Sequence, residues 1–138
     1  MKSTLLNSDQ DTISFGQQFG RTLKGNEILC FSGDLAAGKT TLIKGIISGY
    51  MDYPHGSVNS PTFVYLNIYE GGKTAYHFDF YRLDNPDDFL AMGFDEMLSE
   101  GRLCCIEWPE KVEGYLPPDC LWVSLEHVDE NIRKITIS

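Results

Sequence analysis

One loop carries the clearest chemistry in this sequence. Residues 33–40 read Gly-Asp-Leu-Ala-Ala-Gly-Lys-Thr, which matches the phosphate-loop pattern G-x-x-x-x-G-K-[ST]. In such a loop, backbone N–H groups wrap the phosphates of a nucleotide, and the helix that follows directs its positive end toward them. We expect the Lys39 ammonium to reach the β- and γ-phosphates and the Thr40 hydroxyl to be a ligand of Mg²⁺. The loop therefore predicts a site for ATP and Mg²⁺.

The nucleotide contacts that this pattern predicts extend from the loop into the first turn of the helix. Ala36 occupies a place where glycine is expected, so its methyl group must not crowd the phosphate. Trp108, much later in the chain, either lies over the nucleotide or serves as a core aromatic. The predicted nucleotide-binding residues are Asp34, Leu35, Ala36, Ala37, Gly38, Lys39, Thr40, Thr41 and Trp108.

Two acids at the ends of apolar runs are candidates for the chemistry of hydrolysis. Residues 103–106 read Leu-Cys-Cys-Ile and lead directly into Glu107. Because parallel α/β sheets place ligand sites at the carboxyl ends of their strands, we expect Glu107 at the nucleotide. There it either orients the attacking water or holds the water shell of the metal. Asp79 lies at the end of another strand-like run, where a carboxylate suits Mg²⁺, directly or through water.

The extended segment that contains Asp79 alternates its side chains. His77 and Asp79 point to one face, and Phe78 and Phe80 point to the other. For His77, packing is the better interpretation. Arg82 is either an ion-pair partner of these acids or part of a surface salt bridge of little energetic weight.

A hydroxyl after the loop at 51–60 completes the predicted metal site. Pro61 favours an extended backbone at Ser60, and Ser60-Pro61-Thr62 is typical of a switch in which Thr62 joins Mg²⁺ when the γ-phosphate is present. An N-terminal strand cap is the alternative interpretation of this segment. The predicted metal ligands are Thr40, Thr62, Asp79 and Glu107, and the predicted catalytic residues are Lys39, Asp79 and Glu107.

These residues need a sheet and flanking helices to bring them together. Apolar residues at helical spacing predict two longer helices, and short apolar runs between turn residues predict strands. We expect an α/β fold: a three-layer sandwich like that of P-loop NTPases, with a mixed, centrally parallel sheet and an antiparallel hairpin extension. The helices are expected at 8–23, 39–50, after 85 and at 94–99, and the strands at 27–32, 63–69, 74–80, 102–107, 121–127 and 132–137.

Composition narrows the class of protein. A chain of 138 residues predicts one domain spanning 1–138. The formal net charge of −9 disfavours direct binding to nucleic acid, because the surface repels polyanions. No apolar stretch approaches the length of a membrane span, so we expect a cytoplasmic protein. The cysteines Cys30, Cys104, Cys105 and Cys120 lack a C-x-x-C spacing and are expected to be free thiols, mostly buried.

Three further strings give the sequence a family resemblance. Ser60-Pro61-Thr62-Phe63, His77-Phe78-Asp79-Phe80-Tyr81-Arg82-Leu83 and Ile106-Glu107-Trp108-Pro109-Glu110 follow the phosphate loop in an order and spacing that resemble the TsaE family, formerly YjeE. The resemblance spans essentially the whole chain. The family's loop usually has glycine where this chain has Ala36.

The resemblance implies an activity and partners. The family comprises small bacterial ATPases needed for the threonylcarbamoyl modification of the adenosine next to the anticodon of tRNAs that read ANN codons. It implies action with TsaD, which performs the transfer, and with TsaB. It also implies that tRNA is engaged by the complex rather than by strong direct binding.

Two other functions fit the phosphate loop by itself. A small-molecule kinase needs several arginines to neutralise the transferring phosphoryl group, and only Arg82, Arg102 and Arg133 follow the loop. A GTPase is disfavoured because no N-K-x-D string occurs. A non-catalytic adaptor, in which ATP only stabilises a binding surface, is compatible with the sequence.

Overall fold

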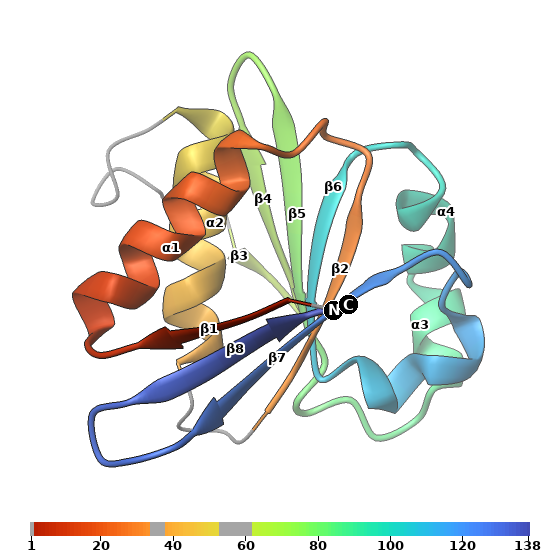
Figure 1. The fold of residues 1–138 in the computed structure, drawn as a ribbon. Coiled ribbons are helices and arrows are strands. Elements are labelled where there is room, and N and C mark those ends of the chain that lie inside the picture. The colour runs from red at the N-terminus through yellow and green to blue at the C-terminus, as the bar shows by residue number, and fades with distance from the viewer. Residues whose placement is uncertain (1, 34–37, 53–61) are drawn as a thin grey trace.

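A single mixed sheet organises the chain (Figure 1). The computed structural model describes residues 2–33, 38–52 and 62–138, and within them eight strands pair in the order β1-β8-β7-β2-β6-β5-β4-β3. Their bounds are β1 (Lys2–Leu6), β2 (Ile28–Ser32), β3 (Thr62–Phe63), β4 (Leu66–Glu70), β5 (Thr74–Asp79), β6 (Leu103–Glu107), β7 (Leu121–His127) and β8 (Arg133–Ile137).

The centre of the sheet is parallel and its two sides are antiparallel. Strand β2 pairs in parallel with both β6 and β7, and β6 pairs in parallel with β5. The pairs β5–β4, β4–β3, β7–β8 and β8–β1 are antiparallel. Every residue of β6 is buried, as expected for a strand covered on both faces. The predicted mixed, centrally parallel sheet is confirmed.

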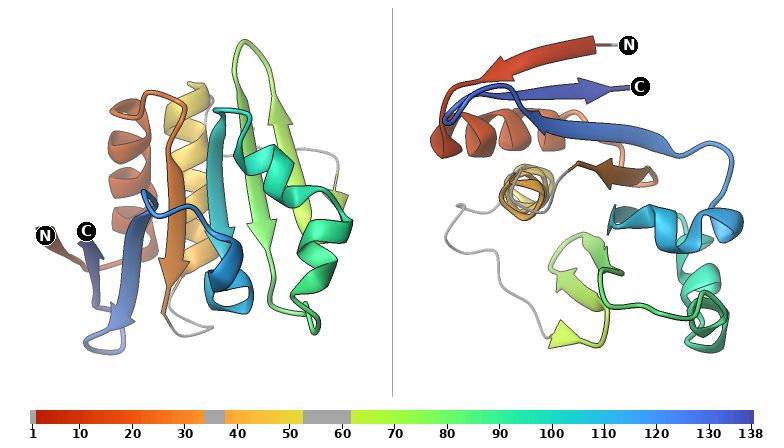
Figure 2. Two further views of the ribbon diagram at one scale, coloured as in Figure 1. Left: turned by 90° about the vertical axis from the view of Figure 1, so that its right-hand side faces the viewer. Right: turned by 90° about the horizontal axis from the view of Figure 1, so that it is seen from below.

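Helices cover both faces of this sheet (Figure 2). They are α1 (Asp9–Arg21), α2 (Lys39–Met51), α3 (Asp87–Ala91), α4 (Phe94–Leu98) and the 3₁₀ helix η2 (Pro109–Tyr115). One apolar cluster joins α2 to one face of the sheet, and a second joins the short helices to the other face. No described helix is long and apolar enough to cross a membrane. The three layers agree with the predicted sandwich.

The alternation of side chains places the candidate acids in the layer of α2. In β6, Leu103 and Cys105 belong to the cluster under α2, whereas Cys104 and Ile106 belong to the opposite cluster. Glu107 is the next residue in the first series and therefore lies on the α2 side. Strand β5 behaves in the same way, so His77 and Asp79 share the face of Ala75.

Three local predictions need correction. The single strand predicted at 63–69 is two strands, because Tyr65 has a φ of 65° and turns the chain between β3 and β4. No strand was predicted at the N-terminus, yet β1 forms by pairing with β8, a contact between the two ends of the sequence. The 3₁₀ helix η2 was also not predicted. Of the loop predicted at 51–60, Met51 belongs to α2 and residues 53–61 lie outside the described residues.

Glycines bring α1 and α2 into backbone contact. A Cβ atom added to Gly20 would lie 2.1 Å from the carbonyl oxygen of Ile46, and one added to Gly49 would lie 2.1 Å from that of Gln17. Gly16 and Gly45 leave similarly little room. Side chains at these places would separate the helices, so the glycines set the position of α2, and with it that of the phosphate loop at its start.

The four cysteines are free, as predicted. Burial raises the pKa of Cys104 to about 12 and raises those of Cys30 and Cys105 as well, whereas Cys120 is only partly buried. Because thiolate is the reactive form, we expect a disulfide reagent at pH 8 to modify at most one thiol in the folded protein and four in denaturant. Cys120→Ala should remove the one that reacts. Rapid labelling of two or more thiols in the folded protein would contradict this burial.

Candidate active site

The carboxyl ends of β2, β5 and β6 meet at one edge of the sheet, the lower edge in Figure 1. The phosphate-loop sequence connects β2 to α2 at this edge. Its two glycines are needed for different physical reasons. Gly33 has a φ of 135°, and a Cβ atom there would lie 2.1 Å from the carbonyl oxygen of Leu125. Gly38 has room around it but a φ of 92°, which side-chain-bearing residues rarely adopt. Residues 34–37, and with them Ala36, lie outside the described residues.

The phosphate-loop lysine is held between the loop and an aromatic ring. Lys39 is 3% exposed, and its Nζ donates a hydrogen bond of 2.8 Å to the carbonyl oxygen of Gly33. The same atom lies 4.0 Å from the centre of the Trp108 ring, within the range of a cation–π contact. An ammonium has three donors, so this arrangement leaves donor capacity for a phosphate.

The backbone of Trp108 is bent to make that contact. Its φ of 59° and ψ of 49° are left-handed, a conformation that costs a residue with a side chain about 1–2 kcal/mol. The bend directly follows Glu107 and brings the indole against Lys39 and against Tyr81, whose ring centre is 5.0 Å away. Trp108 is half-buried: it lies beside the phosphate-loop lysine and also packs against the apolar cluster under the short helices, so both interpretations stay open.

Glu107 is the centre of a hydrogen-bond cluster in which Glu107 and His77 are buried and Thr40 is exposed. The carboxylate is 4% exposed. The Thr40 hydroxyl donates to it, 3.1 Å from Oε1 and 3.2 Å from Oε2, and His77 Nε2 lies 2.7 Å from Oε2. Because an ionised carboxylate only accepts, Nε2 is the protonated nitrogen in this arrangement. The first turn of α2 is thereby tied to the ends of β6 and β5.

The role of His77 was underestimated from the sequence. It is buried like a packing residue, at 4% exposure, yet it positions the carboxylate that ends the neighbouring strand. Its other nitrogen, Nδ1, has no hydrogen-bond partner among the described residues. The signal that pointed to it was the alternation that puts His77 and Asp79 on one face.

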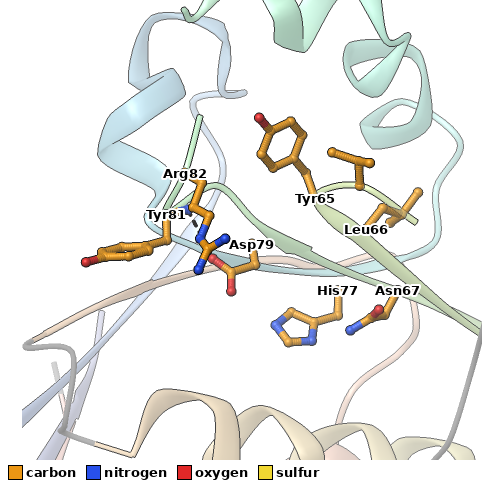
Figure 3. A pocket seen from close by; sticks show the side chains of 8 residues that line it. Tyr65, Leu66, Asn67, His77, Asp79, Tyr81 and Arg82 are labelled. Carbon is orange, nitrogen blue, oxygen red and sulfur yellow. Dashed lines mark hydrogen bonds between the residues drawn. The ribbon is translucent and has the colours of Figure 1, made fainter. Parts of the chain in front are cut away.

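Asp79 lies beside Glu107 and is accessible. The two residues are direct partners in the parallel register of β5 and β6. Asp79 is exposed, and its Oδ1 accepts a 3.0 Å hydrogen bond from the backbone N–H of Tyr81. With His77 it lines a pocket of about 320 Å³ (Figure 3), whose wall is made by Val64, Tyr65, Leu66, Asn67, His77, Asp79, Tyr81 and Arg82.

Three predicted site residues are placed only in part. Thr41 follows Thr40 in the first turn of α2 and is half-buried. The backbone of Thr62 begins β3 and pairs with Asn67, but its side chain lies outside the described part of the structure. Its role as a switch ligand stays a prediction. Arg82 lines the pocket with Asp79.

The oxygen donors at this edge fit Mg²⁺ bound together with a nucleotide. The described residues contain no group of three or more His, Cys, Asp or Glu side chains able to hold a metal by themselves. Mg²⁺ commonly takes one or two protein oxygens and completes its shell with phosphate oxygens and water. Thr40, Asp79 and Glu107 offer such a partial set.

Comparisons with known proteins agree on one family. A model described as "Threonylcarbamoyl adenosine biosynthesis protein TsaE" matches residues 6–135. Proteins named tRNA threonylcarbamoyladenosine biosynthesis protein TsaE are among the relatives of this chain. That of Rickettsia bellii is 39% identical over 98% of this chain and 93% of its own, and that of Treponema pallidum is 37% identical over 95% and 96%. The crystal structure of Bacillus subtilis YdiB superposes with a TM-score of 0.80 at 26% identity, covering 99% of this chain and 83% of YdiB.

Proposed function

We propose a function for this chain from the premise that it belongs to the TsaE family of threonylcarbamoyl adenosine biosynthesis proteins. The proposed function is to bind and hydrolyse ATP with Mg²⁺ at the sheet edge where β2, β5 and β6 end. The members of this family are proteins of tRNA threonylcarbamoyladenosine biosynthesis. The observation that carries the finer proposal is the hydrogen-bond cluster in which Thr40, from the phosphate loop, donates to the buried Glu107 at the end of a central parallel strand.

The loop and the start of α2 bind the polyphosphate. Backbone N–H groups and the positive end of α2 favour an anion there. Lys39, already turned toward Gly33 and buried under Trp108, adds a positive charge at the β- and γ-phosphates. Thr40, with Asp79 and Thr62, would hold Mg²⁺, which supplies charge neutralisation at the phosphates when bound.

Glu107 orients the attacking water. Its carboxylate is anchored by Thr40 and His77, so it has a fixed direction and needs little reorganisation when the reaction starts. A carboxylate in hydrogen-bond reach of a water can accept its proton as the water attacks the γ-phosphorus.

ATP hydrolysis by this chain takes place as part of a larger assembly of proteins. We place TsaD and TsaB as the partner proteins and the cytoplasm as the compartment, because the modification acts on tRNA. With a formal net charge of −9, this chain repels a polyanion, so tRNA is engaged through the complex.

The test of this function is ATP turnover with Mg²⁺, measured with the chain alone, with TsaB and TsaD, and with tRNA added. We expect low turnover alone and higher turnover with the partners. If ATP bound but was not hydrolysed in any mixture, the chain would be a non-catalytic adaptor and not an ATPase. Rapid phosphorylation of a metabolite would favour the kinase.

Lys39→Ala should lower ATP affinity by about tenfold or more, because each charge-assisted hydrogen bond that is lost contributes about 1.5–3 kcal/mol. Isothermal titration calorimetry with ATP and Mg²⁺ measures this. Lys44→Ala is the matched control, since Lys44 is an exposed lysine on the same helix. Equal affinities of the Lys39 variant and the unmodified chain would remove Lys39 from the phosphate site.

A further inference from the structure

The pocket of Figure 3 contains two buried polar atoms that have no hydrogen-bond partner. They are Nδ1 of His77 and Oδ1 of Asn67, and neither meets a partner among the described residues. Their residues lie directly opposite each other in the antiparallel register of β5 and β4, and both line the pocket. Because a buried polar atom without a partner is unfavourable, a ligand that satisfies both atoms would be stabilised there.

Both atoms require a hydrogen-bond donor. His77 Nε2 lies 2.7 Å from the carboxylate of Glu107, which only accepts hydrogen bonds, so in the neutral ring Nδ1 is left as an acceptor. The amide oxygen of Asn67 is also an acceptor. His77 is 4% exposed, so bulk water has little access to its ring. The group that completes this part of the pocket therefore carries at least two N–H or O–H donors, as an ammonium does.

Two side chains of opposite charge line the same pocket. Asp79 follows His77 on one face of β5, and Arg82 comes shortly after the end of that strand. Both charged side chains are exposed, and Arg82 forms no ion pair with a described residue. A ligand in the pocket can therefore reach a carboxylate and a guanidinium at once. A ligand with a single charge would match only one of them, whereas a zwitterion matches both.

The remaining walls of the pocket suit an apolar side chain. Val64, Tyr65 and Tyr81 contribute aliphatic and aromatic surface, and Val64 and Tyr81 are 64% and 46% exposed. The volume of about 320 Å³ lies at the lower end of the range of small-molecule sites, about 300–1,000 Å³. This size suits an amino acid.

We propose that this pocket binds a free α-amino acid with an apolar side chain. Its ammonium donates to His77 Nδ1 and Asn67 Oδ1, beside the negative charge of Asp79. Its carboxylate pairs with Arg82, and its side chain packs against the apolar walls. Binding needs neither nucleotide nor Mg²⁺, so the proposal goes beyond the proposed function and does not rest on it. Mg²⁺ held by Asp79 would repel the ammonium, so the amino acid and the metal disfavour each other.

Titration of the unmodified chain with L-leucine, without nucleotide or Mg²⁺ and followed by heteronuclear NMR, tests the proposal. We expect saturable shifts of the His77 ring nitrogens and of the Asn67 side-chain amide. The dissociation constant should be on the order of 1 mM, because the ligand is small and the pocket is open. N-acetyl-L-leucine lacks the ammonium and should bind at least about tenfold more weakly. L-leucinamide lacks the carboxylate and should bind at least about threefold more weakly.

Two variants assign these losses to the pocket. Asn67→Leu keeps the approximate size of the side chain and removes one acceptor, so affinity for L-leucine should fall by about tenfold or more. Arg82→Gln should weaken binding of L-leucine by about threefold or more and leave that of L-leucinamide unchanged. Arg102→Gln is the matched control, because Arg102 is an exposed arginine that pairs with Glu100 and does not line the pocket. Thermal unfolding of each variant verifies that it is folded.

Four results would overturn the proposal: no saturable binding of L-leucine, equal affinity for N-acetyl-L-leucine, or unchanged affinity for L-leucine in either Asn67→Leu or Arg82→Gln. The first would mean that a bound water satisfies the two acceptors. Because ATP binding is measured separately, each of these results leaves the proposed function intact. A chain that bound L-leucine but not ATP would instead overturn the proposed function and support this inference.

Discussion

Replacing Glu107 with glutamine is expected to lower ATP turnover by about 100-fold or more, the usual contribution of a positioned general base. Glutamine keeps the shape of the side chain, and its carbonyl oxygen can still accept the hydrogen bond from Thr40. It cannot accept a proton from water. Affinity for ATP should therefore change far less than turnover, by less than about tenfold. Single-turnover kinetics with the partner proteins measure the first quantity, and calorimetry measures the second.

The matched control for this substitution is Glu110→Gln. Glu110 is an exposed acid three residues further on, in η2, so the change of charge is the same while the hydrogen-bond cluster stays intact. Turnover of Glu107→Gln within about threefold of this control would show that Glu107 does not act on water. The carboxylate would then be assigned to the water shell of the metal.

Gly20→Ala is expected to destabilise the protein by about 2 kcal/mol or more, within the range measured for overpacked cores. The added methyl would lie 2.1 Å from the carbonyl oxygen of Ile46 and 2.9 Å from the backbone nitrogen of Tyr50. Backbone atoms of a packed helix cannot rotate away, so α1 and α2 must separate. This outcome opposes the local preference, because alanine favours an isolated helix over glycine by about 1 kcal/mol.

Urea unfolding measures this destabilisation, with Gly72→Ala as the control. Gly72 lies in the turn between β4 and β5, and a Cβ atom added there meets nothing within 4 Å. Because α2 carries Lys39 and Thr40, we also expect the Gly20 variant to bind ATP more weakly. A Gly20 variant as stable as the control would contradict the close contact between the helices.

Much of the fold can be predicted from the sequence because the patterns that indicate it lie within short stretches of residues. The apolar run of β2, the glycines of the loop and the helical stripe of α2 follow one another within about two dozen residues. Each has a local signal: a short apolar run, turn-forming glycines and apolar residues at helical spacing. The helix α1 begins after Ser8, whose side chain accepts a hydrogen bond from the N–H of Asp11, the usual role of a serine at this position. The error in the strand predicted at 63–69 arose because the backbone turns at Tyr65, whose φ is positive.

The sequence predicts the two acids of the candidate site but not the residues that contact them. Strand ends predict where Asp79 and Glu107 lie, because the carboxyl ends of parallel strands meet at one edge. The hydrogen bond of His77 to Glu107 joins residues 30 apart in sequence. It exists because β5 happens to be the neighbour of β6, which no periodicity reveals. In the sequence, Arg133 is one of three arginines after the phosphate loop, and it is the sheet order that brings it to Gly38.

The sequence by itself therefore determined the phosphate loop, the elements on either side of it and the two acids, since each depends on residue type and short-range spacing. Tertiary structure decided which side chains surround them: the anchoring of Glu107 by Thr40 and His77, the contact of Trp108 with Lys39, and the approach of Arg133. The physical reason is that these contacts depend on strand order and on how closely α1 and α2 approach. Both result from burying the whole apolar surface at once.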